Sequence, residues 1–296
     1  MAKIYTPIPS LKLNDGTSMP MLGYGTGTAW FKSGDDTKVD RILIDTIKKA
    51  IEMGYTYLDG GEMYKTEAEL GIAIQESGTD RSKLYVVAKV INNPLDVEGS
   101  LRASLKKLQL DYVDQYLIHH AWWTSSPADI QKSWAQMEAV QALGLTKSIG
   151  VSNFRPQDFE VLLRTAKVVP AINQIEFHPY LQHNALIELH KKHGVATSAY
   201  GPLTPIVKAA GGPVDEALAR LAKKYAVSEG EVLLRWCIDQ DIIPITTSSK
   251  EQRLSDYLRA ATFKLNPSEI QSLKEIGENK HFRGFYTNKF EVNDRT

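Results

Sequence analysis

The stretch Tyr112-Val113-Asp114-Gln115-Tyr116-Leu117-Ile118-His119-His120 runs from an apolar segment into two histidines. Residues 112–118 are rich in β-branched and aromatic side chains, which favour a buried β-strand. The segment 122–127 that follows has no periodicity and predicts a loop. In parallel-sheet enzymes, polar functional groups gather where the strands end. The stretch therefore predicts a buried strand that places His119 at a functional position.

Two earlier segments end in the same way. Residues 55–58 form an apolar run that ends at Asp59, with Tyr64 five residues further on, and residues 84–88 form another that ends at Lys89. An acid, a tyrosine, a lysine and a histidine thus follow three successive predicted strands. Such a series indicates a fold that gathers strand ends at one place.

Strand and helix patterns alternate along the whole chain without a linker or a break in composition. We predict eight strands, around Tyr24 and over residues 55–58, 84–88, 112–118, 147–152, 171–176, 195–200 and 242–247. Helical periodicity follows each one, with two consecutive helices at 214–225 and 228–239 and an extra helix at 267–276. Eight such units in 296 residues predict an α/β fold with a single (β/α)8 TIM barrel, one domain spanning residues 1–296.

Two segments lie outside these units. Residues 11–22 contain an Asn-Asp-Gly turn between short alternating runs, which predicts a β-hairpin that caps one end of the barrel. The tail from His281 onward has several aromatic residues but no clear period. We expect it to fold over the mouth of the barrel as a lid.

Composition narrows the possible partners. Lysine plus arginine equals aspartate plus glutamate at 35 each, and the chain shows no basic stripe, so nucleic acid is not an expected partner. The single cysteine, Cys237, has helical core spacing and excludes an intrachain disulfide, which fits a reducing compartment. The N-terminus lacks an apolar signal core, and no run approaches the roughly 18 to 20 apolar residues of a membrane span. We expect a cytoplasmic protein without a membrane partner.

The residues Asp59, Tyr64, Lys89 and His119 together suggest a specific chemistry. A lysine ammonium beside a tyrosine hydroxyl lowers the pKa of that hydroxyl, and an aspartate paired with the lysine keeps the lysine charged and oriented. A nearby histidine can orient a carbonyl oxygen by hydrogen bonding. This set predicts general-acid delivery of a proton to a developing alkoxide.

Other glycines and histidines have simpler interpretations. The alternating glycines of residues 23–28 lack the spacing of a phosphate-binding loop and favour a strand end. The spacing of His119, His120 and His178 is not a metal-ligand pattern, so no metal is expected. Three histidines on or beside the predicted helix at 186–189 are expected at the surface: His183, His190 and His193.

At these residues the chain resembles the aldo-keto reductases over nearly its whole length. Five segments carry the resemblance in order: residues 58–64, 87–89, 111–119, 149–154 (Ile-Gly-Val-Ser-Asn-Phe) and 173–180 (Asn-Gln-Ile-Glu-Phe-His-Pro-Tyr). The opening at 25–31 resembles the fungal branch that includes conjugated polyketone, ketopantoyl-lactone and α-keto-amide reductases. The resemblance implies a reductase that transfers a hydride from NADPH to a ketone or aldehyde, an activated dicarbonyl, keto ester or keto lactone, with Tyr64 as general acid.

The resemblance also assigns a cofactor site. The residues implied at the nicotinamide carboxamide, the nicotinamide ring and the pyrophosphate are Ser152, Asn153, Gln174, Tyr200, Gly201 and Leu203. At the adenosine end the chain departs from many relatives, because Thr247 stands where they have lysine. We expect the 2′-phosphate to be held by Lys250 and Arg253 with Ser248 and Ser249, which favours NADPH over NADH.

The substrate pocket and the assembly state are less closely defined. Four residues are predicted to wall an apolar substrate pocket: Trp30, His120, Trp122 and Trp123. Relatives imply a monomer or a weak homodimer. Two alternatives stay open: a nicotinamide-binding regulatory subunit, and a Schiff-base aldolase that uses Lys89.

Overall fold

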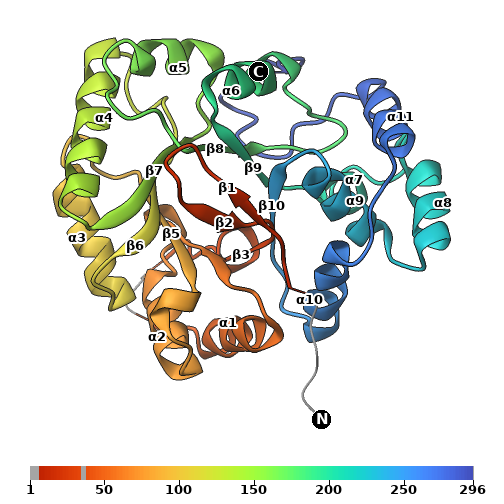
Figure 1. Cartoon of the computed structure of the whole chain (residues 1–296), viewed down its shortest axis with the longest axis horizontal. Coiled ribbons are helices and arrows are strands. Elements are labelled where there is room, and N and C mark those ends of the chain that lie inside the picture. Colours follow the sequence, from red (N-terminus) through yellow and green to blue (C-terminus); the bar gives the residue numbers. More distant parts are fainter. Residues whose placement is uncertain (1–6, 35–37, 296) are drawn as a thin grey trace.

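Eight parallel strands close into a barrel, which confirms the predicted (β/α)8 fold (Figure 1). The strands follow one another in chain order around the ring, and the last pairs with the first. The structure is a computed structural model that describes residues 7–34 and 38–295. The barrel strands are β3 (Gly23–Gly25), β4 (Tyr57–Asp59), β5 (Tyr85–Val90), β6 (Val113–Ile118), β7 (Thr146–Ser152), β8 (Ile172–Glu176), β9 (Ala196–Tyr200) and β10 (Ile242–Thr246).

Helices follow the strands and form an outer layer around the barrel (Figure 1). They are α1 (Arg41–Met53), α2 (Glu67–Ser77), α3 (Val97–Leu108), α4 (Pro127–Ala142), α5 (Pro156–Leu163), α6 (Asn184–His193), α8 (Asp215–Tyr225), α9 (Glu229–Ile238), α10 (Glu251–Leu258) and α11 (Pro267–Glu278). The sequence pattern did not predict α7 (Thr204–Val207), a single turn, or the short 3-10 helices η1 (Thr28–Trp30), η2 (Glu62–Tyr64), η3 (Arg81–Lys83) and η4 (Arg259–Ala261). These short elements carry too few residues for a helical period to be visible.

Helix α1 illustrates how local sequence defines the outer layer. Asp40 caps its first turn by accepting hydrogen bonds from the backbone N–H groups of Ile42 and Leu43, and Gly54 ends it with a φ of 110°. Leu43 and Ile47, one turn apart, are fully buried against the barrel. Each such aliphatic side chain contributes roughly 1.5 to 3 kcal/mol through burial.

Strand β6 explains why the sequence showed near-continuous apolar runs. All six of its residues are buried, because barrel strands face the packed interior on one side and helices on the other. Asp114 is the charged exception. Its carboxylate lies 2.7 Å from Arg81 and 2.9 Å from Lys147, and it also accepts from the Val86 backbone N–H. The ion pairs let a charged residue occupy a buried strand.

The predicted hairpin forms and lies across one end of the barrel (Figure 1). Its strands are β1 (Ser10–Lys12) and β2 (Ser18–Pro20), and Gly16 takes the left-handed conformation in the turn. Asp15 accepts a hydrogen bond from Ser148 of β7 at 2.5 Å, and Asn14 donates to the Pro170 carbonyl. These contacts attach the hairpin to the amino-terminal ends of the strands.

The C-terminal tail, residues 281–295, crosses the opposite end. Phe282 donates its backbone N–H to the Tyr180 carbonyl, and Gly284 donates to the Glu176 carboxylate at 2.7 Å. Glu176 ends β8, so the tail is attached at the carboxyl ends of the strands. The tail therefore forms the predicted lid.

Burial corrects one prediction about the histidines. His183 and His190 were expected at the surface, but they are 4% and 1% exposed. His183 donates from Nε2 to the Glu176 carbonyl, and His190 lies between Asn173 and Thr197, so both serve as internal hydrogen-bond partners. Cys237 is buried, as its helical spacing indicated.

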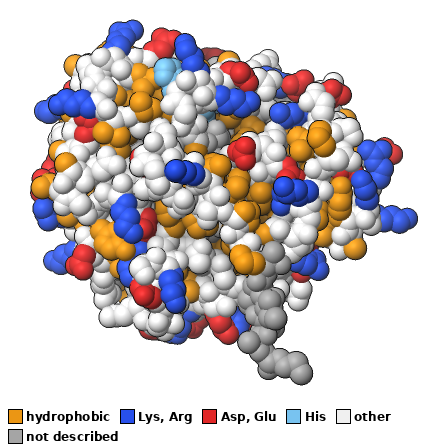
Figure 2. Space-filling model, viewed as in Figure 1, with side chains coloured by type: hydrophobic (Ala, Val, Ile, Leu, Met, Phe, Trp, Pro, Cys, Tyr) orange, Lys and Arg blue, Asp and Glu red, His pale blue; other side chains and the backbone are white. Residues whose placement is uncertain are grey.

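The exterior carries charges of both signs. On the face shown in Figure 2, lysine and arginine side chains are interspersed with aspartate and glutamate, and no large region has a single sign. Within residues 7–34 and 38–295, no helix is long and apolar enough to cross a membrane.

Candidate active site

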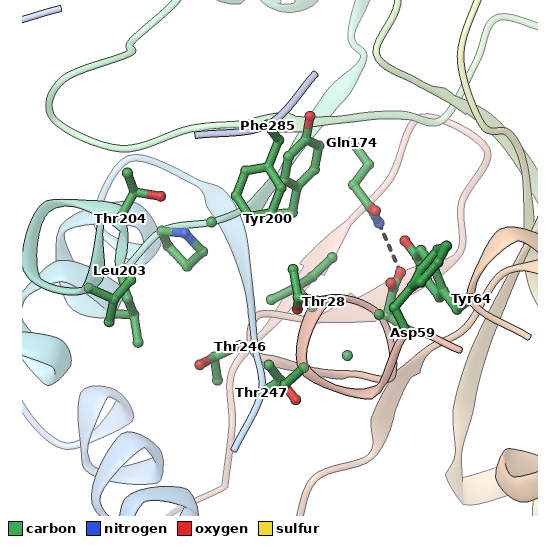
Figure 3. A pocket seen from close by; sticks show the side chains of 18 of the residues that line it. Thr28, Asp59, Tyr64, Gln174, Tyr200, Leu203, Thr204, Thr246, Thr247 and Phe285 are labelled. Carbon is green, nitrogen blue, oxygen red and sulfur yellow. Dashed lines mark hydrogen bonds between the residues drawn. The ribbon is translucent and has the colours of Figure 1, made fainter. Parts of the chain in front are cut away.

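A cavity of about 780 Å³ opens at the carboxyl ends of the barrel strands. Its size falls in the range of roughly 300 to 1,000 Å³ typical of small-molecule sites. Asp59, Tyr64 and Gln174 lie together at one side of it, and Leu203 and Thr204 lie at the other (Figure 3). The cavity is thus elongated from a polar, buried end toward the loops that follow β9 and β10.

The Asp59–Lys89 pair forms the base of the buried end. The two residues come from the neighbouring strands β4 and β5, and Lys89 Nζ lies 2.7 Å from Asp59 Oδ2. Lys89 also donates to the Gly60 carbonyl at 2.7 Å, while Asp59 Oδ1 accepts from Gln174 Nε2 at 2.9 Å (Figure 3). The side chains are 0% and 4% exposed. A charge pair this deeply buried is held by several hydrogen bonds, which fix the position of the ammonium group.

Tyr64 lies directly above this pair. Lys89 Nζ is 4.8 Å from the centre of the Tyr64 ring, and the His119 ring meets it edge-on with centres 5.5 Å apart. Gly27 leaves space for the ring, because a Cβ at that position would lie 3.0 Å from Tyr64 Cζ. The structure therefore brings together the four residues that the sequence series predicted.

The protonation states differ in part from the prediction. Burial, with a smaller contribution from Asp59, raises the pKa of the Tyr64 hydroxyl well above its usual value. The predicted net lowering of this pKa is wrong for this structure, because desolvation of the phenolate outweighs any stabilisation of the phenolate by Lys89. Burial likewise lowers the pKa of Lys89, against the opposing effect of Asp59, and lowers that of His119. Tyr64 therefore keeps its proton at neutral pH, and His119 is a neutral imidazole.

The predicted nicotinamide-end residues form one hydrogen-bonded network. Asn153 donates from Nδ2 to the His119 carbonyl at 3.0 Å and to Ser152 Oγ at 2.9 Å, and its Oδ1 accepts from the Tyr200 hydroxyl at 2.6 Å. Ser152 Oγ donates to the Gln174 carbonyl at 2.8 Å. Because Gln174 also contacts Asp59, this network is directly joined to the Asp59–Lys89 pair.

The middle of the cavity has features that suit a long phosphate-bearing cofactor. Gly201 has a φ of 65°, and a Cβ there would lie 2.9 Å from Phe285. Glycine therefore suits this part of the cavity wall, because a side chain would be strained and would collide with Phe285. Among the described residues, the buried hydroxyls of Thr204 and Thr246 have no hydrogen-bond partner, and both line the cavity. Unpaired buried hydroxyls on residues that line a cavity fit the ribose and phosphate oxygens of a dinucleotide.

At the far end, the predicted adenosine residues are only partly in the cavity wall. Thr247 and Arg253 line it, together with Leu203. Ser248, Ser249 and Lys250 lie just before α10 and do not line it, although Lys250 is exposed beside them. Arg253 is therefore the predicted phosphate contact that already faces the cavity.

The predicted substrate-pocket residues are not in the cavity wall: Trp30, His120, Trp122 and Trp123. Trp122 stacks on His120 with centres 4.6 Å apart and meets Tyr286 edge-on at 5.1 Å, so these rings lie behind the wall and support it. The apolar wall itself contains residues that the sequence reasoning did not select: Phe31, Met63, Val207, Tyr257 and Tyr286. Phe31 directly follows Trp30. The sequence reasoning therefore selected the correct loop for the pocket wall but chose the neighbouring residue.

Within the described ranges, no group of three or more histidine, cysteine, aspartate or glutamate side chains is placed to hold a metal ion.

Comparisons with known proteins relate the chain to one family. The model of the aldo/keto reductase family matches residues 22–278. A relative from Schizosaccharomyces pombe, an NAD/NADP-dependent indole-3-acetaldehyde reductase, is 39% identical over 91% of this chain and 96% of its own. An NADPH-dependent alpha-keto amide reductase from Saccharomyces cerevisiae is 33% identical over 94% and 93%. The crystal structure of a Bombyx mori aldo-keto reductase in complex with NADP superposes with a TM-score of 0.82 at 33% identity, covering 92% and 93%.

Proposed function

Because the chain belongs to the aldo/keto reductase family, whose members are oxidoreductases that act on carbonyl compounds, we propose that it is an NADPH-dependent carbonyl reductase with Tyr64 as proton donor. The observation that supports this proposal most directly is the convergence of Asp59, Lys89, Tyr64 and His119 at the buried end of one cavity. Each of these groups has a definite task in carbonyl reduction.

Ser152, Asn153 and Gln174 would hold a nicotinamide cofactor, which would supply the hydride for the carbonyl carbon. His119, as a neutral imidazole that lines the cavity, holds the carbonyl oxygen by a hydrogen bond. The Tyr64 hydroxyl gives its proton to that oxygen as negative charge develops there, and an alcohol results. The raised pKa of Tyr64 keeps this proton in place until the oxygen becomes basic. Lys89, held by Asp59, then stabilises the phenolate that remains.

The cofactor preference rests on the far end of the cavity. Arg253 lines it, and Lys250 lies three residues earlier at the N-terminus of α10. An arginine and a lysine at this position suit a phosphomonoester, which NADPH has and NADH lacks. One relative uses either cofactor by name and another uses NADPH, so the preference of this chain is a proposal.

The substrate class rests on the apolar wall around the polar end. Phe31, Met63 and Tyr286 give this part of the cavity aromatic and thioether surfaces. Such surfaces favour a ring-bearing carbonyl, and an adjacent electron-withdrawing group makes the carbonyl a better hydride acceptor. We therefore include activated dicarbonyls, keto esters and keto lactones as substrates.

The Schiff-base aldolase has less support than the reductase. Its nucleophile, Lys89, is fully buried, is paired with Asp59, and does not line the cavity. Borohydride in the presence of substrate would trap a covalent adduct on Lys89 only if the protein were an aldolase. The regulatory-subunit alternative predicts cofactor binding without turnover.

The decisive experiment follows NADPH oxidation with a panel of aldehydes, α-keto esters, keto lactones and dicarbonyls. We expect turnover with activated carbonyls, and we expect Tyr64→Phe to lose about 10²- to 10⁴-fold in kcat, the usual contribution of a general acid. Fluorescence titration should give an unchanged affinity for NADPH in the variant. Near-wild-type turnover of Tyr64→Phe would show that another group donates the proton.

A further inference from the structure

Tyr286 of the C-terminal tail lies at the reactive end of the cavity. It lines the cavity together with Met63 and Tyr64, and its hydroxyl donates to Met63 Sδ at 3.8 Å. Met63 directly precedes Tyr64 in η2, so the Tyr286 hydroxyl contacts the same short helix that carries the proposed proton donor. Burial raises the pKa of the Tyr286 hydroxyl, with a smaller contribution in the same direction from Tyr64 and an opposing one from Lys89, so this hydroxyl keeps its proton.

The tail is built so that this position is held. Glu176, at the end of β8, accepts hydrogen bonds from the backbone N–H groups of Gly284 at 2.7 Å and Phe285 at 3.2 Å. Lys208 donates to the Gly284 carbonyl at 2.8 Å, which attaches the same two residues to the loop after β9. The Tyr286 ring then packs edge-on against Trp122. Contacts from three separate segments thus converge on the residues around Tyr286.

The backbone at Tyr286 supports the same interpretation. Its φ is 53°, a left-handed conformation that a bulky residue adopts only at a cost of about 1 kcal/mol or more. The surrounding contacts maintain this conformation, and it directs the ring inward. Tail packing alone is already provided by Phe282 and Phe285, so the inward tyrosine calls for its own explanation.

The hydroxyl is an available hydrogen-bond donor. A thioether sulfur is a weak acceptor, so exchanging Met63 for an oxygen acceptor on a ligand costs little. Tyr64, His119 and Tyr286 all line this cavity, so a substrate whose carbonyl oxygen is held by Tyr64 and His119 lies in the same cavity as the Tyr286 hydroxyl. A second oxygen in the substrate therefore meets a donor there.

We propose that Tyr286 determines specificity by donating a hydrogen bond to a second oxygen adjacent to the reacting carbonyl, so that vicinal dicarbonyl compounds are selected over other activated carbonyls. This inference rests on the proposed carbonyl reductase function. It assigns Tyr286 a substrate contact, with Glu176 as a positioning residue that acts through the tail.

The test compares two substrates that are both activated and both carry a ring. In 1-phenyl-1,2-propanedione the activating group is an adjacent carbonyl, whereas in 4-nitrobenzaldehyde it is a remote nitro group. Tyr286→Phe keeps the ring and removes only the donor. We expect kcat/KM for the dione to fall about 3- to 10-fold, as for the loss of one neutral hydrogen bond, while that for the aldehyde changes less than about twofold. NADPH affinity should stay the same.

Two further variants separate this role from a structural one. Tyr225→Phe is the control: it also removes a hydroxyl, which donates to Glu269 of α11. It should leave kcat/KM for both substrates unchanged. As a single change, Glu176→Gln should lower the ratio of kcat/KM for the dione to kcat/KM for the aldehyde. Added to Tyr286→Phe, it should change this ratio little further. If Glu176→Gln does not fold, Tyr286→Phe alone decides the matter.

Each result has a clear meaning. Equal losses on both substrates, or no loss on the dione, would overturn the assignment of Tyr286. A wild-type protein that oxidises NADPH with neither substrate would instead contradict the reductase function on which the assignment rests.

Discussion

Replacing Asp59 by asparagine removes the negative partner of a buried lysine. Lys89 is fully buried, and its ammonium donates hydrogen bonds to Asp59 Oδ2 and the Gly60 carbonyl, each at 2.7 Å. With Gln174 in its present orientation, the new amide brings two donors together whichever way it turns. If its oxygen faces Lys89, its NH2 group meets the Gln174 donor that now lies 2.9 Å from Asp59 Oδ1. If it turns around, two donors face each other at Lys89.

The expected loss follows from this geometry. An uncompensated buried charge destabilises a protein by about 3 to 5 kcal/mol, and we expect Asp59→Asn to lose this much free energy of unfolding near neutral pH. Replacing both partners, as Asp59→Asn with Lys89→Met, should recover most of the loss, because an apolar side chain of similar length needs no counter-charge. Urea unfolding followed by tryptophan fluorescence and circular dichroism measures all three proteins.

The pH dependence gives a second check. Burial lowers the pKa of Lys89 below its usual value, and Asp59 opposes this effect, so the variant should have a still lower pKa. Between the folded pKa and the higher unfolded pKa, the unfolded chain binds more protons, and stability rises with pH. The loss caused by Asp59→Asn should therefore be smaller near about pH 9 than near about pH 7. A loss below about 1 kcal/mol, or a double variant no more stable than Asp59→Asn, would refute the reasoning.

Two other predictions concern the ends of the cavity. Arg253→Ala with Lys250→Ala should weaken NADPH binding by roughly 1.5 to 3 kcal/mol for each charge-assisted hydrogen bond to the phosphate, and should leave NADH binding unchanged. Fluorescence titration measures both affinities. Equal affinity of the wild-type protein for the two cofactors would contradict this prediction. Phe31→Ala should reduce kcat/KM for ring-bearing ketones more than for small aliphatic ones, since it removes apolar wall. Trp122→Ala should change the ratio of kcat/KM for ring-bearing ketones to kcat/KM for small aliphatic ketones only indirectly, through the Tyr286 ring that Trp122 supports. If this ratio is unchanged in both Phe31→Ala and Trp122→Ala, the substrate ring binds elsewhere.

The site shows where sequence reasoning succeeds and where it fails. Asp59, Lys89 and His119 were found because each lies at or just after the carboxyl end of a buried strand, and parallel strands in a barrel deliver these ends to one face. Tyr64 was found by its fixed distance from Asp59. The direction of the Tyr64 pKa was not predictable in the same way, since it depends on how completely packing removes water from the hydroxyl.

The cavity wall shows the same limit more strongly. Trp122 was selected because an indole after the catalytic strand suggests a pocket, yet it lies behind Tyr286, which comes from a tail more than 150 residues later in the chain. His183 was expected at the surface because it lies beside a predicted helix, yet it hydrogen-bonds the Glu176 carbonyl in the interior. In both cases the deciding contact joins segments that no local pattern connects.

The sequence by itself determined the order of strands and helices, the closure into a barrel and the set of polar strand ends, because these depend on periodicities of a few residues and on the apolar character of buried strands. Only the tertiary structure decided which side chains wall the cavity, how the tail is attached through Glu176, and which groups keep or lose their protons. These properties depend on distances and solvent exclusion between distant segments, and such quantities exist only once the chain has folded.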